Sequence, residues 1–277
     1  MGDLAHDTEV VGTDGCYRAT VSGDWEIWGP MGGYVAAIAL RAAAQEAPAG
    51  LEPATFTCQF LSPARFEAVD INVTVRRASR RAAAITAHVE QDGTAVLDAQ
   101  VWFATPNDVV RHDHAKAHRH GHPDDHPPIS EYTDEKPGFP FWYNFEAKPL
   151  DWIEDWESFP GGDPEWAEWV KFVPTSAFDD PVLEAARLVL LADLPSFPAA
   201  VRAHPGGPPT FVSPSLDLAV QFHRLADLGD WLLVQGVTPI AERGLMGFRS
   251  EVWSADGRQV ASGSGQLLLR AAPPPTD

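Results

Sequence analysis

An internal repeat constrains the fold of this chain more than any other feature of its sequence. Thr57-Cys-Gln-Phe60 in the first half matches Ala219-Val-Gln-Phe222 in the second, and Asp92-Gly93 and Asp256-Gly257 follow at nearly equal distances. Asp-Gly between two alternating runs is a strong signal for a β-hairpin. An apolar helical run precedes the strands of each half. The sequence therefore predicts an α+β unit, a helix followed by an antiparallel sheet, that occurs twice in tandem.

The helix of each half is expected to be buried against its own sheet. The first runs from Tyr34 to Glu46 and is apolar almost all round, and the second runs from Pro181 to Ala203, with an interruption near Pro195 and Pro198. Strands are expected at 16–21, 55–61, 69–76, 82–91 and 96–104, and then at 139–146, 164–173, 214–224, 231–238, 247–253 and 259–269. Because a sheet wrapped on one helix leaves an edge that a second copy can pair, the two halves are expected to form one pseudo-dimer.

A polar linker, residues 107–136, separates the N-terminal repeat at 1–106 from the C-terminal repeat at 137–277. It is rich in proline and aspartate and contains six of the ten histidines, namely His112, His114, His118, His120, His122 and His126. Its composition indicates a linker. A metal site is the alternative, because imidazoles are good ligands, although no helical spacing organises these residues. We expect a protein without a metal or a cofactor.

Length and charge narrow the class of protein. With 277 residues, 44% of them apolar, the chain can form one large core or two domains. A formal charge of −19 would repel a phosphodiester backbone, so nucleic acid is not expected as a partner. No apolar run is long enough to span a bilayer and the N-terminus lacks the regions of a signal peptide, so we expect a cytoplasmic protein with no membrane partner. Cys16 and Cys58 are expected to be reduced, ordinary thiols.

One basic cluster interrupts this acidic composition. It consists of Arg76, Arg77, Arg80 and Arg81. It either binds the phosphate groups of a small ligand or forms a solvated strand end and turn.

A carboxylate inside a strand marks the candidate site. In the run from Pro214 to Arg224, one face carries Leu218, Val220 and Phe222, and the other carries Asp217, Ala219, Gln221 and His223. Aspartate is disfavoured in strands. Asp217 therefore belongs to an edge strand that meets water, orders the preceding turn, or is held there to orient a water.

The sequence lacks the motifs of the commonest hydrolases. It has neither a Gly-x-Ser-x-Gly elbow nor a His-Glu-x-x-His zinc motif, and neither cysteine has a histidine beside it in sequence. The residues present are suited to a reaction in which water is the nucleophile. In such chemistry a carboxylate acts as base, hydroxyl and amide groups hold the water, and backbone N–H groups stabilise the oxyanion.

Several short motifs follow one another in a fixed order along both halves. They are Gly29-Pro-Met-Gly-Gly-Tyr34, Phe60-Leu-Ser-Pro63, Ser215-Leu-Asp217, Phe222-His-Arg224, Asp256-Gly257, Val260-Ala-Ser262 and Gln266-Leu-Leu-Leu-Arg270. In this order they resemble the double hotdog acyl-CoA thioesterases of the thioesterase II type, over nearly the whole chain except the linker and the ends. The resemblance implies a double hotdog fold that associates further into homo-oligomers. It also implies hydrolysis of an acyl-CoA substrate without a metal or a covalent intermediate.

The resemblance also implies which residues act. Family members hold the nucleophilic water with an Asp, a Thr or Ser, and a Gln, and Asp217 falls directly on the Ser-Leu-Asp motif. Thr238 lies in the strand that carries the hydroxyl. An ungapped count back from Asp256-Gly257, however, puts the family position on Pro239, one residue away.

The family glutamine is displaced in the same way. Gln266 lies one residue beyond the family position, which falls on Gly265. An offset of one turns a strand side chain to the opposite face. Gln266 therefore reaches the site only if the glycines around Ser264 form a bulge; otherwise Ser264 takes over part of the role.

Other positions receive roles from the same resemblance. Gly32, Gly33 and Tyr34 are expected to line the acyl or pantetheine channel, and the arginine cluster could meet the phosphates of CoA. The first half has Thr55 where the second has Asp217, so one of the two pseudo-equivalent sites carries a carboxylate. His223 shares a face with Asp217 but lies about 20 Å along the strand, which favours a structural role.

Two other functions are compatible with the sequence. A non-catalytic acyl-CoA or acyl-chain binding protein of hotdog fold would explain the displaced glutamine. A hotdog hydratase or dehydratase is the third hypothesis, but the chain lacks an Asp and His pair at the spacing of such enzymes. Chain length and acyl type depend on the shape of the pocket, which the sequence does not reveal.

Overall fold

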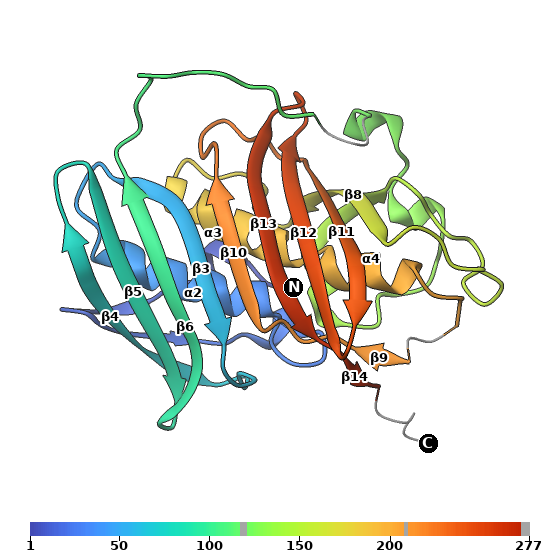
Figure 1. Ribbon diagram of the computed structural model, residues 1–277, viewed down its shortest axis with the longest axis horizontal. Coiled ribbons are helices and arrows are strands. Elements are labelled where there is room, and N and C mark those ends of the chain that lie inside the picture. Colours follow the sequence, from blue (N-terminus) through green and yellow to red (C-terminus); the bar gives the residue numbers. More distant parts are fainter. Residues whose placement is uncertain (117–120, 208–209, 273–277) are drawn as a thin grey trace.

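One antiparallel sheet of twelve strands organises the molecule (Figure 1). The computed structural model describes residues 1–116, 121–207 and 210–272. Helices α2 (Gly32–Gln45) and α3 (Pro181–Asp193) lie side by side against one face of the sheet, behind the strands in Figure 1. We call the face that contacts these helices the inner face, and the opposite one the outer face.

The order of the strands repeats outward from the centre of the sheet. The first half contributes β1 (Val11–Thr13), β2 (Cys16–Thr20), β4 (Ala68–Ala78), β5 (Ala82–Gln91), β6 (Thr94–Ala104) and β3 (Glu52–Phe60). The second half continues with β10 (Asp217–Phe222), β13 (Gln259–Leu268), β12 (Leu245–Ser254), β11 (Leu232–Glu242), β8 (Glu165–Phe172) and β7 (Phe145–Pro149). Outside this sheet lie α1 (Leu4–Asp7), α4 (Ser196–Arg202), four 3-10 turns, η1 (Gly23–Trp25), η2 (Pro123–Asp125), η3 (Ile129–Glu131) and η4 (Pro140–Asn144), and the pair β9 (Phe211–Val212) and β14 (Arg270–Ala271).

The two halves join through β3 and β10, at the centre of the sheet. Thr57 of β3 lies directly opposite Ala219 of β10. These are the two residues that the sequence repeat aligns, so the pseudo-two-fold axis passes through this pair. The predicted double hotdog, with one helix and one antiparallel sheet in each half, is confirmed. Asp217 therefore lies on a central strand, and the edge-strand interpretation is wrong.

Both helices are buried, as their apolar composition predicts. In α2 the fully buried residues include Ala36, Ala39 and Leu40, and alanine allows the two helices to lie close together. The α3 helix begins after Asp180, whose side chain accepts a hydrogen bond from the Val182 N–H at 2.8 Å.

Proline ends α3 near the predicted place. The helix ends at Asp193, just before Pro195, and α4 follows it as a separate short helix. Pro198 lies inside the first turn of α4, where a missing N–H is tolerated.

The sequence predicted the hairpin turns correctly but wrongly predicted one aromatic-rich strand. Asp92 and Gly93 both have positive φ values, 49° and 74°, as a two-residue hairpin turn requires. The strand expected at 139–146 is instead mostly the 3-10 turn η4, and β7 begins only at Phe145. Pro140 favours the turn because it fixes φ and lacks an N–H, and Phe141 then packs on Trp25 with ring centroids 6.2 Å apart.

The linker runs past the upper ends of the strands in Figure 1. Asp113 accepts a hydrogen bond from the Arg224 guanidinium at 2.8 Å, and the Pro123 carbonyl accepts one from Lys148 Nζ at 2.7 Å. His118 and His120 lie outside the described residues. In the part of the chain that the structure describes, no group of three potential metal ligands comes together.

No helix within the described ranges is long and apolar enough to cross a membrane.

Candidate active site

Elements from both halves meet where α2 begins. Asp193, the last residue of α3, accepts a hydrogen bond from the Gly33 N–H through Oδ2 at 2.9 Å. Its other oxygen, Oδ1, accepts one from the Ser215 hydroxyl, just before β10, also at 2.9 Å. A Cβ on Gly32 would lie 3.0 Å from Asp193 Oδ2. We call these four residues together with Asp217 the α2-start site.

Burial has the largest effect on the pKa values of the Asp193 carboxyl group and the neighbouring Cys58 thiol. Asp193 is 7% exposed, and desolvation raises the pKa of its carboxyl group, although the hydrogen bonds from Ser215 and Gly33 favour the charged form. The Cys58 thiol on β3 is buried too, and its pKa is raised by desolvation and then by the charges of Asp193 and Asp217. Both carboxylates therefore act on the same buried thiol.

Asp217 is held at the start of β10 by a bulge. Its Oδ1 accepts a hydrogen bond from the Gln266 N–H of β13 at 2.8 Å. From Ser215 to Ala219 the chain advances four residues, whereas the partner strand advances three, from Leu267 to Ser264. The extra residue leaves the Gln266 N–H without a ladder acceptor, and the Asp217 carboxylate supplies one.

The neighbouring strand does not bring the Gln266 side chain onto the inner face. The pairing of β12 with β13 is regular past Ser264, so the bulge expected at these glycines is absent from this pair. Gly265 faces inward, where a Cβ would lie 2.7 Å from the Phe248 ring and would also collide with the Asp217 carbonyl oxygen. The Gln266 side chain lies over Gly247, whose added Cβ would be 3.5 Å from its Oε1. Gln266 thus contributes its backbone N–H to the α2-start site.

The two hydroxyl candidates from the sequence lie elsewhere. Ser264 is exposed on the outer face, between Gly263 and Gly265, which face inward. Thr238 lies on β11, and two strands separate β11 from β10, which places it about 14 Å away along the sheet. Its hydroxyl is buried and has no hydrogen-bond partner among the described residues. Pro239, at the family position, is exposed in the β11 bulge.

The start of α2 offers one free backbone donor. The described residues give the half-buried Gly32 N–H no acceptor, whereas the Gly33 N–H is occupied by Asp193. Such an N–H at a helix start can stabilise an oxyanion. Tyr34 is fully buried, and its hydroxyl donates to the Asp7 carbonyl at 2.7 Å and accepts from the Ser22 N–H at 3.1 Å. Tyr34 is therefore a core residue whose hydroxyl already has two hydrogen-bond partners. Gly32 and Gly33 remain as candidates for substrate contact.

Gly33 also sets the distance between the two helices. A Cβ there would lie 2.9 Å from Leu190 Cα and 3.1 Å from Asp193 Cβ. Both neighbours belong to α3, so the helices must separate to admit a methyl group. We expect Gly33→Ala to lower the free energy of unfolding by about 1–3 kcal/mol, measured by urea denaturation. Gly23→Ala is the control, because an added Cβ there has no neighbour within 4 Å; an equal loss in both variants would contradict this account.

The start of α3, which corresponds by the pseudo-two-fold symmetry to the start of α2, offers no comparable backbone donor among the described residues. Pro181 begins α3 and has no N–H, and Asp180 already caps the next residue. The buried pair of Arg187 and Glu184, 2.8 Å apart, lies in the same turns of α3. Thr55 replaces the carboxylate, as the repeat predicted, and lies opposite Gln221. Within the described residues, one site of this kind therefore occurs, at the start of α2.

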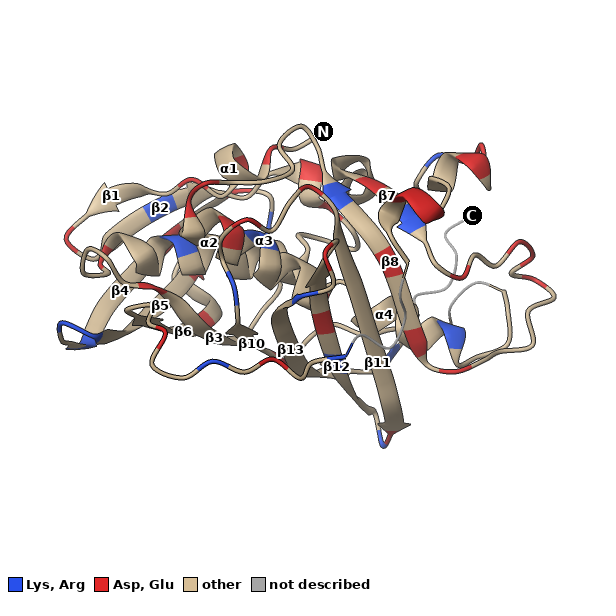
Figure 2. Ribbon diagram, turned by 90° about the horizontal axis from the view of Figure 1, so that it is seen from above, with Lys and Arg blue, Asp and Glu red and all other residues tan. Residues whose placement is uncertain are grey.

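His223 and the arginine cluster lie away from this site. His223 Nε2 lies 3.0 Å from Ser262 Oγ on the outer face, and desolvation followed by the charge of Arg224 lowers the pKa of the imidazole. The arginine cluster lies at the end of β4, with Arg76 and Arg77, and in the turn to β5, with Arg80 and Arg81 (Figure 2). Because β3 and β10 are antiparallel, this turn is about 20 Å along the strands from Asp217, which favours the solvated-turn interpretation.

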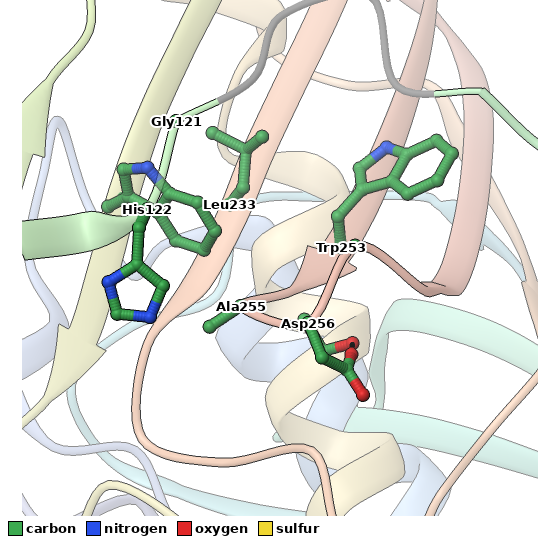
Figure 3. Close-up of a pocket in the computed structure, with 9 residues that line it drawn as sticks. Gly121, His122, Leu233, Trp253, Ala255 and Asp256 are labelled. Atoms are coloured by element: carbon green, nitrogen blue, oxygen red, sulfur yellow. Dashed lines mark hydrogen bonds between the residues drawn. The ribbon is translucent and has the colours of Figure 1, made fainter. Parts of the chain in front are cut away.

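Two cavities open on the outer face of the sheet. One, of about 340 Å³, lies between Trp169, Leu233 and Trp253, beside His122 of the linker (Figure 3). The other, of about 410 Å³, is lined by polar residues that include Gln59 and His88. The sheet separates the outer face from the start of α2, so neither cavity is lined by Gly32, Gly33 or Asp193, although Gln59 of the second cavity pairs with Asp217.

Sequence reasoning missed Asp193 and gave Ser215 no role. Asp193 ends the apolar run Leu188-Val-Leu-Leu-Ala192. A carboxylate at the end of such a run is the signal that indicates a buried, hydrogen-bonded acid. No pattern in the sequence places it against Gly33, because that contact joins the two halves.

Two family models match the sequence in order. The acyl-CoA thioesterase N-terminal domain matches residues 21–104, and the acyl-CoA thioesterase C-terminal domain matches residues 123–269. No curated protein matches the sequence.

Solved structures share the whole fold at low sequence identity. A protein of unknown function with a hot dog fold from Alicyclobacillus acidocaldarius is 21% identical, with a TM-score of 0.81 and 98% of each chain covered. An acyl-CoA thioesterase II from Mycobacterium marinum is 19% identical, with a TM-score of 0.78, and covers 98% of this chain and 99% of its own. A TesB protein from Mycobacterium avium subspecies paratuberculosis is 21% identical, with a TM-score of 0.74, and covers 96% and 98%.

Proposed function

Because this chain belongs to the acyl-CoA thioesterase family, we propose that its α2-start site hydrolyses the thioester of a fatty or related acyl-CoA with a water held by Asp217. The chain is an acyl-CoA thioester hydrolase. The supporting observation is that Asp193 holds Ser215, two residues before Asp217, against the start of a buried helix whose Gly32 N–H has no acceptor among the described residues.

The reaction follows from the roles of these groups. Asp217 accepts a proton from the water, whose oxygen attacks the thioester carbonyl carbon. The carbonyl π electrons move to oxygen, and the Gly32 N–H stabilises the resulting oxyanion. When the carbonyl re-forms, the C–S bond breaks and its electron pair leaves with sulfur, which takes the proton from Asp217. The products are a carboxylic acid and CoA thiol.

The remaining parts of the site support this sequence of steps. The Gln266 N–H fixes Asp217 Oδ1, so the other carboxylate oxygen is directed to the water.

We further propose that the protein acts in the cytoplasm as a homo-oligomer of double hotdog protomers. Size-exclusion chromatography with light scattering tests the oligomeric state, and a mass of one 30.1 kDa chain would contradict it.

Non-catalytic binding of acyl-CoA is the competing function, and one observation favours it. At the two family positions for the hydroxyl and the glutamine, this chain has Pro239 and Gly265, which cannot hold a water by side-chain hydrogen bonds. The test compares acyl-CoAs of short, medium and long chain with a thioether analogue that cannot be hydrolysed. We expect the analogue to bind and the thioesters to release free thiol. Binding of the analogue without release of thiol from any thioester would select the binding function.

A further inference from the structure

We propose that Ser215 supplies the hydroxyl that holds the attacking water and that Asp193 positions this hydroxyl. The inference rests on the proposed function of the α2-start site and adds two residues to it. Thr238 and Ser264, the hydroxyl residues that the sequence suggested, lie on a distant strand and on the outer face. Ser215 precedes Asp217 by two residues, is half-buried, and donates its hydroxyl to the buried Asp193.

The hydrogen bond between Ser215 and Asp193 determines what the hydroxyl can do. Ser215 donates its hydrogen to Asp193 Oδ1, so the lone pairs on Oγ remain free to accept. Asp217 uses Oδ1 for the Gln266 N–H, and the described residues give its other oxygen no partner. A water can therefore donate one hydrogen to Ser215 and the other to Asp217. Its own lone pair is then left for the carbonyl carbon.

Asp193 also links this water to the oxyanion donor. One carboxylate oxygen accepts from Ser215 at the start of β10, and the other accepts from Gly33 at the start of α2. The free N–H of Gly32 belongs to the residue before Gly33. A single buried carboxylate thus fixes the water holder and the oxyanion donor relative to one another, although they come from opposite halves of the chain. Such positioning has large effects, since an error of about 1 Å can cost about 100-fold in rate.

Substitution of Ser215 tests the role of the hydroxyl. We expect Ser215→Ala to lower kcat about 100-fold with little change in KM, and Ser215→Thr, which keeps a hydroxyl, to restore most of the rate. Ser250→Ala is the matched control. It removes the hydroxyl of a buried serine, which donates to the Ala192 carbonyl next to Asp193 at 2.7 Å, and it should keep kcat within about twofold. Equal losses in Ser215→Ala and Ser250→Ala would mean that loosening of α3 explains the effect.

A double-mutant cycle tests whether Asp193 acts through Ser215. Asn at 193 keeps an oxygen for the Gly33 N–H but presents an amide donor to Ser215, which reverses the direction of that hydrogen bond. We expect Asp193→Asn to lower kcat about tenfold to 100-fold in the unaltered protein and by less than about threefold in the Ser215→Ala background. The same loss in both backgrounds would overturn the positioning role.

The outcomes separate this inference from the function on which it rests. If the unaltered protein releases thiol but Ser215→Ala retains its kcat, this inference is wrong and the proposed function stands. If the unaltered protein releases no thiol from any acyl-CoA, both are wrong. Circular dichroism and the unfolding midpoint of each variant exclude misfolding. If Ser215→Ala does not fold, the rate of the soluble Ser215→Thr variant decides, and a loss as large as that of Asp217→Asn would count against the hydroxyl.

Discussion

Asp217→Asn is expected to lower kcat by a factor of about 100 to 10,000 while the protein remains folded. The loss follows because an amide cannot accept the proton of the attacking water. The fold is expected to survive because the asparagine oxygen can still accept the Gln266 N–H, as Asp217 Oδ1 does at 2.8 Å. Release of thiol from acyl-CoA measures the rate, and the urea midpoint measures the fold.

A matched carboxylate on the outer face provides the control for this variant. Asp98 lies on β6, pairs with His88 and is exposed, so Asp98→Asn makes the same chemical change away from α2. We expect its kcat to stay within about twofold of the unaltered protein. An Asp217→Asn variant that is as fast as Asp98→Asn would remove Asp217 from the reaction.

Glu168→Gln is expected to make the protein more stable at pH 8 by about 3 kcal/mol and to change its stability little at pH 4.5. Glu168 is 3% exposed, its Oε1 has no hydrogen-bond partner among the described residues, and desolvation raises its pKa from 4.5 to about 7. The raised pKa means that the folded protein holds the proton more tightly than the unfolded chain. The protonated carboxyl is accommodated at low pH, and stability falls as the pH rises from 4.5 through about 7.

Urea unfolding at pH 4.5, 6 and 8 checks whether stability falls as the pH rises. The difference between Glu168→Gln and the unaltered protein isolates Glu168 from the other groups that titrate in this range. Glu146→Gln is the control, because Glu146 is an exposed carboxylate on the adjacent strand β7, paired with Lys171 at 3.0 Å. Its effect should stay within about 0.5 kcal/mol at each pH. A Glu168→Gln variant that gained stability at low pH and lost the gain at pH 8 would contradict the assignment.

Local patterns in the sequence predicted most of the fold. The Asp-Gly turns, the alanine-rich helix and the repeated Gln-Phe strands each report on neighbouring residues, and the duplication then implies how the two copies pair. The register of Thr57 opposite Ala219 follows from that symmetry. The 3-10 turn at Pro140 escaped prediction because aromatic alternation resembles a strand, and the packing of Phe141 on Trp25 is a contact between the halves.

The site was harder to predict, for physical reasons. Asp217 was identified because a motif surrounds it. Asp193 and Ser215 meet only after α3, α2 and β10 have packed, so no window of sequence contains their contact. The bulge before Asp217 depends on a register slip between two strands, which alternation alone does not reveal.

Single-turnover hydrolysis of an acyl-CoA in ¹⁸O-water, with the mass of the intact protein recorded during the reaction, tests the central claim most directly. Direct attack by a water held at Asp217 predicts one ¹⁸O in the carboxylate product, one free thiol per turnover and no acylated protein. A covalent acyl adduct during turnover, or the absence of thiol release, would contradict it.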